Sequence, residues 1–221
     1  MALTTTYLDL VNDVLVRLRE AQVASVSQNT YSALIGKLVN DAKREVEDSW
    51  NWDTLRNTTS FTTQQGTFNY NLANAGNKFR VIAAHNDTDN IFLQYRPPRY
   101  FIQQLLLTQS PQQGAPVYYN HNGVSAGRDG QIDLLPIPDA DYVIHFDLVI
   151  TEDELSADTN TTALQKNVIT SLAWAKAIEE RGEDGGISVS SQYGVANKAL
   201  ADAIAIEAAR RPDEETVWYP S

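Results

Sequence analysis

The sequence contains no cysteine among its 221 residues. Disulfide bonds and thiolate metal sites are therefore excluded, because both need the cysteine sulfur atom. No uninterrupted apolar stretch approaches the roughly 20 residues that cross a bilayer, so we expect no membrane partner. The first residues lack a basic region, and Asp9 and Asp13 interrupt any apolar run, so a signal peptide is not predicted.

Basic residues are also scarce. The chain has 17 Lys and Arg against 28 Asp and Glu, which gives a formal net charge of −11. Proteins that hold nucleic acid by its phosphates need clustered Lys and Arg, so tight binding of that kind is not expected. An acidic surface is compatible with DNA that passes without sticking, and the alternative is a merely soluble acidic protein.

The sequence shows no catalytic motif. The glycine-rich stretch 123–130 is not followed by Lys-Ser or Lys-Thr, so it predicts a hairpin loop rather than a phosphate-binding loop. The acidic pairs within 152–154 and 179–180 fit solvated charge at a linker and a helix end. Since a nucleophile motif such as G-x-S-x-G is also missing, we predict no enzyme and no cofactor.

Three histidines are spread through the middle of the chain at His85, His121 and His145. Their separations do not match a metal-ligand motif, so no metal site is predicted. Surface or half-buried histidines are the favoured interpretation. A two-histidine site assembled by the fold is the alternative.

What the sequence does contain is a change of period. Apolar residues recur at helical spacing over about residues 5–52, alternate over about 56–150, and return to helical spacing over about 162–211. This predicts an α+β fold, a helical bundle built from both chain ends with an inserted small β-sandwich or barrel module. The expected divisions are 1–55 and 152–211 for the bundle, 56–151 for the insert and 212–221 for an extended tail.

Helical periodicity predicts two helices near each end of the chain. The first is capped by one of the threonines at 4–6, and the second begins at Asn29 or Thr30. The third is capped by Thr161 or Thr162, and the fourth is rich in alanine. We expect one shared core that contains Leu8, Val11, Leu15, Leu18, Leu34, Leu38, Leu164, Val168 and Leu172.

The middle of the chain carries about six to eight short alternating stretches, a number that suits a small sandwich or barrel. The segments 61–63 and 67–72 flank Gln65-Gly66 and predict a hairpin. Pro97 and Pro98 predict a short helical turn, because proline is tolerated only in the first turn of a helix.

Two aromatic segments stand out as candidate interaction sites. Trp50-Asn51-Trp52 follows the second predicted helix and marks either a junction between the bundle and the β module or a plug at the base of the bundle. The chain ends in a polar segment that finishes in aromatics, which favours a docking peptide over a tail packed on its own domain. The residues predicted to dock are Arg210, Arg211, Val217, Trp218 and Tyr219.

In their order along the chain, these features resemble the head-to-tail adaptors of short-tailed bacteriophages, the tail tubular protein A type. The resemblance covers most of the length. It rests on the helix around Val11-Asn12-Asp13-Val14-Leu15, the Trp50-Asn51-Trp52 turn and the alanine-rich final helix pair. The segments 66–72 and 134–139 add to it, since both are similar to stretches of phage connector proteins.

The resemblance implies a structural protein of the virion tail, assembled in the host cytoplasm. It implies a dodecameric ring that joins the portal protein to the tail nozzle protein and tail fibres, with double-stranded DNA passing through during genome ejection. One alternative is an adaptor or head-completion protein of a long-tailed phage. The other is a carbohydrate-binding β module on a helical stalk, with Tyr95, Tyr100, Tyr118 and Tyr119 as its stacking platform.

Overall fold

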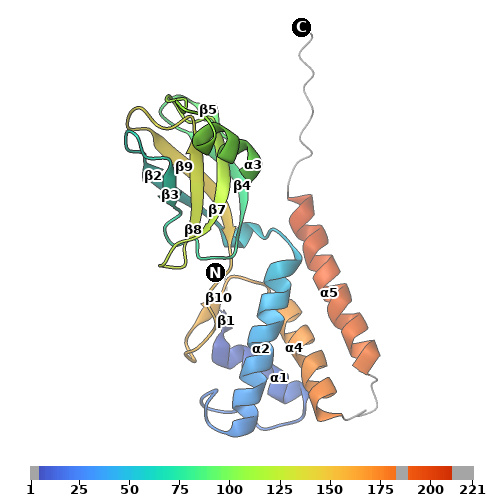
Figure 1. Cartoon of the computed structure of the whole chain (residues 1–221). Helices are drawn as coiled ribbons and strands as arrows, with labels where there is room; N and C mark the ends of the chain where they lie inside the picture. The colour runs from blue at the N-terminus through green and yellow to red at the C-terminus, as the bar shows by residue number, and fades with distance from the viewer. Residues whose placement is uncertain (1–4, 183–188, 211–221) are drawn as a thin grey trace. The chain divides into compact units, whose positions relative to one another are not determined.

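The computed structural model describes residues 5–182 and 189–210, and the fold is a mixture of helices and sheets (Figure 1). The chain divides into two compact units. The helical unit combines the residues up to 54 with those from 152 onward, and the β unit covers 55–151.

The helical unit holds most of the helical structure and one small two-stranded sheet. In chain order its elements are β1 Thr5–Thr6, α1 Tyr7–Arg17, α2 Thr30–Ser49, β10 Thr161–Thr162, α4 Lys166–Arg181 and α5 Val189–Ala209. A short 3-10 helix at Asp53–Leu55 crosses the boundary between the units. β1 and β10 pair antiparallel, with Thr5 opposite Thr162.

This pairing corrects the predicted start of the third helix. Thr161 and Thr162 form β10 rather than a helix cap, and α4 begins at Lys166 after Gln165, whose side chain makes no capping bond. Thr162 lies four residues before α4, too far to cap it, and its hydroxyl instead accepts the Leu164 N–H at 3.2 Å.

The core of the helical unit also differs in one respect from the prediction. Five predicted residues are buried, namely Val11, Leu15, Leu164, Val168 and Leu172. The other four are only half-buried, namely Leu8, Leu18, Leu34 and Leu38. On α2 the buried apolar stripe runs through Ile35, Val39, Ala42 and Val46 at three- and four-residue steps. Leu38 therefore lies on the flank of this stripe, and its place in the core was wrongly predicted.

The β unit consists of two four-stranded sheets, ordered β2-β9-β4-β5 and β3-β8-β7-β6. The strands are β2 Arg56–Thr62, β3 Asn69–Asn71, β4 Phe79–Asn86, β5 Ile91–Phe92, β6 Gln94–Tyr95, β7 Tyr118–Val124, β8 Gly130–Leu135 and β9 Val143–Ile150. Every pair is antiparallel except β6–β7. The sheets do not close into a barrel, so the sandwich is the alternative that the fold adopts.

A helical segment, α3 Pro98–Phe101, continues as one π-helical stretch over Ile102–Leu106. Pro98 occupies the first turn, where its missing N–H has no helical partner to lose. The predicted turn after the two prolines is therefore confirmed.

The predicted hairpin around Gly66 is wrong in its pairing. The chain does turn there, with Gly66 at φ +79°, but β2 and β3 belong to different sheets. β2 pairs with β9, and β3 pairs with β8. Alternation shows which face of a strand is buried and leaves the partner strand open, so a turn between sheets has the same sequence pattern as a hairpin.

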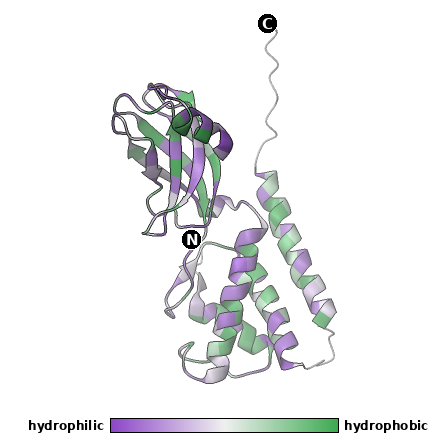
Figure 2. Cartoon of the chain, viewed as in Figure 1, coloured by the Kyte–Doolittle hydropathy of each residue, from purple (hydrophilic) through white to green (hydrophobic). Residues whose placement is uncertain are grey.

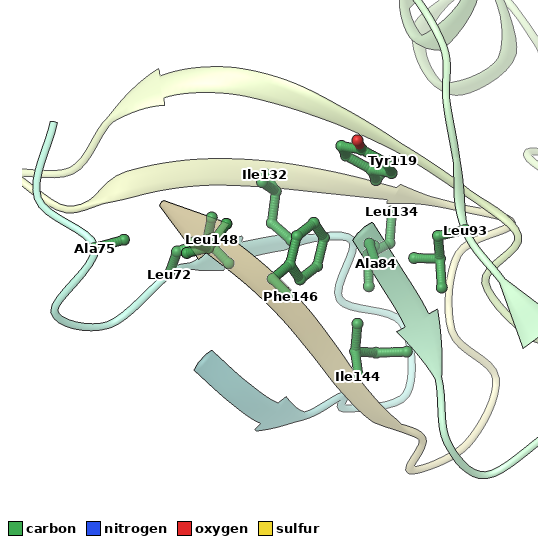
Figure 3. Close-up of a cluster of buried hydrophobic side chains, with 10 residues drawn as sticks. All are labelled: Leu72, Ala75, Ala84, Leu93, Tyr119, Ile132, Leu134, Ile144, Phe146 and Leu148. Carbon is green, nitrogen blue, oxygen red and sulfur yellow. The ribbon is translucent and has the colours of Figure 1, made fainter. Parts of the chain in front are cut away.

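The two sheets enclose one hydrophobic core. On β9 the side chains of Ile144, Phe146 and Leu148 point inward, because successive residues of a strand face opposite sides. Figure 3 shows Phe146 directed from β9 toward Ile132 of the opposite sheet. The complete cluster contains Leu72, Ala75, Ala84, Leu93, Tyr119, Ile132, Leu134, Ile144, Phe146 and Leu148.

Candidate functional site

The segment after α2 ends the helix through side-chain contacts. Trp50 adopts an extended backbone and stops α2. The Trp52 side chain is buried, and its indole N–H donates a 2.7 Å hydrogen bond to the carbonyl of Val46. The Ser49 hydroxyl donates to the same oxygen at 2.7 Å. Val46 carries one of the last four carbonyls of α2, which lack helical partners, so Trp52 secures the helix end.

A buried ion pair joins α2 to the chain that returns from the β unit. Lys43 and Glu47 are one turn apart, their side chains are 3% exposed, and Nζ lies 2.6 Å from Oε1. Lys43 also donates to the carbonyls of Glu152 and Asp153, and its Nζ lies 3.4 Å from Oε2 of Glu152. Glu47 accepts the backbone N–H of Glu152 at 3.2 Å. One buried cluster thus holds the returning chain against α2.

The C-terminal end of α5 is held by a second buried acid. Glu207 is 2% exposed and accepts the backbone N–H of Asp53 at 2.7 Å and Nη1 of Arg210 at 3.0 Å. Arg210 was a predicted docking residue, and its side chain is 56% exposed. The other predicted docking residues, Arg211, Val217, Trp218 and Tyr219, lie outside the described residues.

α5 buries little of its apolar surface. Within its 21 residues the buried side chains are Gln192, Ala196, Ala203 and Glu207. Val195 and Ile206 remain 54% and 55% exposed. Figure 2 shows apolar residues along the length of this helix. By contrast, α4 buries eight of its 16 residues. α5 therefore presents an apolar surface that the described chain does not cover.

The tyrosines proposed as a sugar-stacking platform do not share one face. Tyr118 and Tyr119 are consecutive in β7 and so point to opposite sides of the sheet. Tyr119 is 8% exposed and belongs to the core. Tyr100 meets Tyr118 edge to face at 5.7 Å, and the Arg96 guanidinium lies over the Tyr118 ring at 4.8 Å. This arrangement lacks the flat exposed set that the carbohydrate alternative requires.

An apolar surface that the sequence did not single out lies on the π-helical stretch and just after it. Leu106 and Leu107 are 74% and 76% exposed, and Ile102 is 49% exposed. Next to it is a cavity of about 250 Å³ lined by residues of this stretch and by Phe68, Asn120 and His121. The sequence signal for this surface was the run of leucines at 105–107, after the two prolines. Three consecutive leucines do not show which side of so short a helix packs against the sheet.

The sequence of the chain matches a known family. A family model described as SU10 adaptor protein matches residues 5–218. The chain belongs to the SU10 adaptor protein family. This confirms the predicted membership of a phage head-to-tail adaptor family. A search of curated proteins gave no match.

Membership of the SU10 adaptor family indicates a structural component of the phage particle that interacts with other virion proteins. A structural adaptor needs protein surfaces rather than a catalytic set. The family match continues past Arg210 and ends at residue 218, so it includes Val217 and Trp218 of the predicted docking tail but not Tyr219. No helix in the described part of the chain is long and apolar enough to cross a membrane.

Proposed function

We propose that this adaptor forms a ring that joins the portal protein to the tail nozzle and tail fibres of a short-tailed phage. In this proposal the ring is a dodecamer, and double-stranded DNA passes through it during ejection. Helices from both chain ends form the bundle that faces the portal, and the β unit faces the tail. The observation that carries the proposal is the exposed apolar surface of α5.

The surface of α5 calls for a neighbouring subunit. A surface helix with one covered side normally shows polar residues on its other side, whereas apolar residues on several faces indicate burial on more than one side. Val195 and Ile206 lie outside the face that α5 buries against its own unit. The many alanines allow a second helix to approach closely. A ring supplies such a neighbour to every copy.

The net charge supports a channel for DNA. Each chain has a formal charge of −11, and an acidic wall repels a polyanion instead of binding it. We expect Asp and Glu to outnumber Lys and Arg on the wall of the assembled channel. A structure of the ring with a wall lined mainly by Lys and Arg would contradict this part of the proposal.

The test of the ring is the mass of the protein alone and mixed with its portal, measured by native mass spectrometry. We expect a ring on the portal for the native chain. Val195→Asp and Ile206→Asp should reduce ring formation while the monomer keeps its melting temperature. The matched control is Val16→Asp on α1, because Val16 is also an exposed valine, at 52%. Equal assembly of all three variants would remove α5 from the interface.

We further propose that the segment after Arg211 docks on the portal. Val217, Trp218 and Tyr219 supply the apolar contact, and main-chain hydrogen bonds from strand addition add to it. Repetition of a weak contact around the ring gives avidity. A chain truncated after Arg211 should fold and leave the portal faster than the full chain in a surface-binding assay. If it stays attached as firmly, the helices alone hold the ring.

A further inference from the structure

We propose that the β unit carries a surface site for a divalent transition metal ion, formed by His85, Asp87 and His145. One ligand atom from each of these side chains lies within 4.8 Å of the other two. His85 and Asp87 come from the end of β4 and the residue after it, and His145 comes from the middle of β9.

Strand register places the two histidines together. β4 and β9 pair antiparallel, and His85 lies directly opposite His145. Directly opposed residues have Cβ atoms about 4.5–5.5 Å apart, so their side chains meet. The imidazole rings stack with centroids 4.9 Å apart and planes 10° from parallel. Ile144 and Phe146 flank His145 and are buried in the core, so the histidine pair lies on the opposite face of this sheet.

Asp87 is directed to the same site by its backbone. It follows His85 by two residues, so the two share a side of the strand. Its N–H donates a 2.9 Å hydrogen bond to the carbonyl of Val143, two residues before His145, which holds it beside β9. Within residues 5–182 and 189–210, none of the three side chains has a hydrogen bond or ion pair. Their donor atoms converge without protein partners.

The donor set selects the class of metal. Imidazole nitrogen suits zinc, copper and nickel, whereas magnesium and calcium prefer sites made of oxygen alone. Zinc ligands lie about 2.0–2.2 Å from the ion, so donors up to 4.8 Å apart must move closer on binding. Rotation about χ2 brings the imidazole nitrogens together and breaks their parallel stacking, and this torsion is soft.

Coordination would then join β4, β9 and the turn after β4 through one ion. His85 and His145 are half-buried and Asp87 is exposed, so the ion would be reached from the surface. Three protein ligands leave one tetrahedral position for water or for a donor from another molecule.

The test is titration of the full chain, without an affinity tag, with Zn²⁺ alone in a calorimeter. We expect one ion per chain. His85→Gln and His145→Gln should each weaken binding by at least about tenfold, the loss typical even of an outer partner of a metal ligand. Asp87→Asn should weaken it less, because the amide oxygen remains a donor.

The matched control is His121→Gln. His121 lies on β7 in the other sheet, opposite Ile132, so its loss should leave the affinity unchanged. Each variant is checked by thermal melting without metal. Co²⁺ provides a second measurement, since its visible absorption should change with the native chain and remain that of the aqueous ion with His145→Gln. No saturable Zn²⁺ binding, or equal binding by native chain and His145→Gln, would overturn the proposal.

Discussion

In the β unit each sheet covers the inner face of the other, whereas in the helical unit α5 is covered on one side and leaves Val195 and Ile206 exposed. The β unit completes its hydrophobic core within one chain. The helical unit instead uses buried charged side chains to fix the positions of its segments: Lys43 pairs with Glu47, and Glu207 accepts the backbone N–H of Asp53. The difference lies in the core rather than in the amount of exposed apolar surface. The β unit buries its core between its own sheets and exposes apolar side chains outside it, such as Leu106 and Leu107, whereas in the helical unit a main helix keeps one apolar flank uncovered.

The two units can be followed separately. All four tryptophans, Trp50, Trp52, Trp174 and Trp218, lie outside 55–151. Tryptophan emission therefore reports the helical unit and the tail, and hydrogen exchange of peptides from 55–151 reports the β unit. A change made in one unit should move one signal only, if the units unfold independently.

The largest expected effect is in the β unit. Phe146 is fully buried and its ring meets Tyr119 edge to face at 5.3 Å. Phe146→Ala should cost about 3–5 kcal/mol of stability, because it leaves a cavity that the two sheets cannot close. Hydrogen exchange in 55–151 should accelerate while the urea midpoint of tryptophan emission stays constant.

The control for Phe146 is Phe92→Ala. Phe92 is 74% exposed at an edge of the same sheet, so its loss should change stability by about 0.5 kcal/mol or less. If Phe146→Ala lowers the tryptophan midpoint as much as it accelerates exchange in the β unit, the two units unfold together and the comparison fails.

The next effect concerns the buried ion pair of the helical unit. Lys43→Met leaves Glu47 buried without its cation and close to Glu152, so we expect a loss of about 3–5 kcal/mol in the tryptophan transition. The double variant Lys43→Met with Glu47→Leu should recover most of this loss, since a buried pair is often replaceable by apolar side chains. If the double variant is no more stable than Lys43→Met, the stability that Lys43 contributes comes mainly from its hydrogen bonds to the carbonyls of Glu152 and Asp153 rather than from its pairing with Glu47.

A smaller difference separates two neighbours on α2. Ile35 is 1% exposed, so Ile35→Ala should cost about 2–5 kcal/mol. Leu38 is half-buried on the flank of the stripe, and Leu38→Ala should cost clearly less. Urea unfolding followed by tryptophan emission measures both. Equal losses of stability would mean that Leu38 is a core residue. The surface that α2 buries against α1 and α4 would then be wider than the structure shows.

The helices were predictable because local signals define them. The start of α1 is fixed by Thr6, and the alanine-rich pattern gave α5 nearly its full length. The sequence did not show whether Leu38 or Val39 faces the core. A helix with apolar residues at both positions can be rotated so that either residue is buried. Only packing against α4 and α1 decides it.

The candidate sites depended on contacts that are distant in sequence. His85 and His145 are 60 positions apart, and they meet only because β4 pairs with β9 in one register. A shift of one residue would place them on opposite faces. The same holds for Asp53 and Glu207 at the end of α5. The Trp52 bond to the Val46 carbonyl, by comparison, joins residues six positions apart and lies close to the end of a predicted helix.

The smallest expected effect is at the first turn of α1, where Thr6 and Asp9 form a reciprocal cap. The Asp9 N–H donates to the Thr6 hydroxyl at 3.2 Å, and the Thr6 N–H donates to Asp9 at 3.1 Å. Thr6→Ala should cost about 1 kcal/mol, the usual value of a lost cap. Urea unfolding followed by tryptophan emission measures it.

The charge of Asp9 adds a pH dependence that can be tested separately. Thr6, through its side chain and its backbone N–H, lowers the pKa of the Asp9 carboxyl below its usual value. The unfolded chain therefore binds the proton more readily than the folded one, so the stabilisation is complete above about pH 4 and is lost as the pH falls through the lowered pKa. Asp9→Asn keeps an oxygen acceptor and removes the charge, so it should be less stable than the native chain at pH 7, with the difference shrinking below about pH 4. The control is Asp153→Asn, since the exposed Asp153 side chain makes no hydrogen bond or ion pair within the described residues. If Asp9→Asn and Asp153→Asn show the same dependence of stability on pH, Asp9 acts only through the net charge of the chain. The stabilising effect of the cap would then come from Thr6 alone.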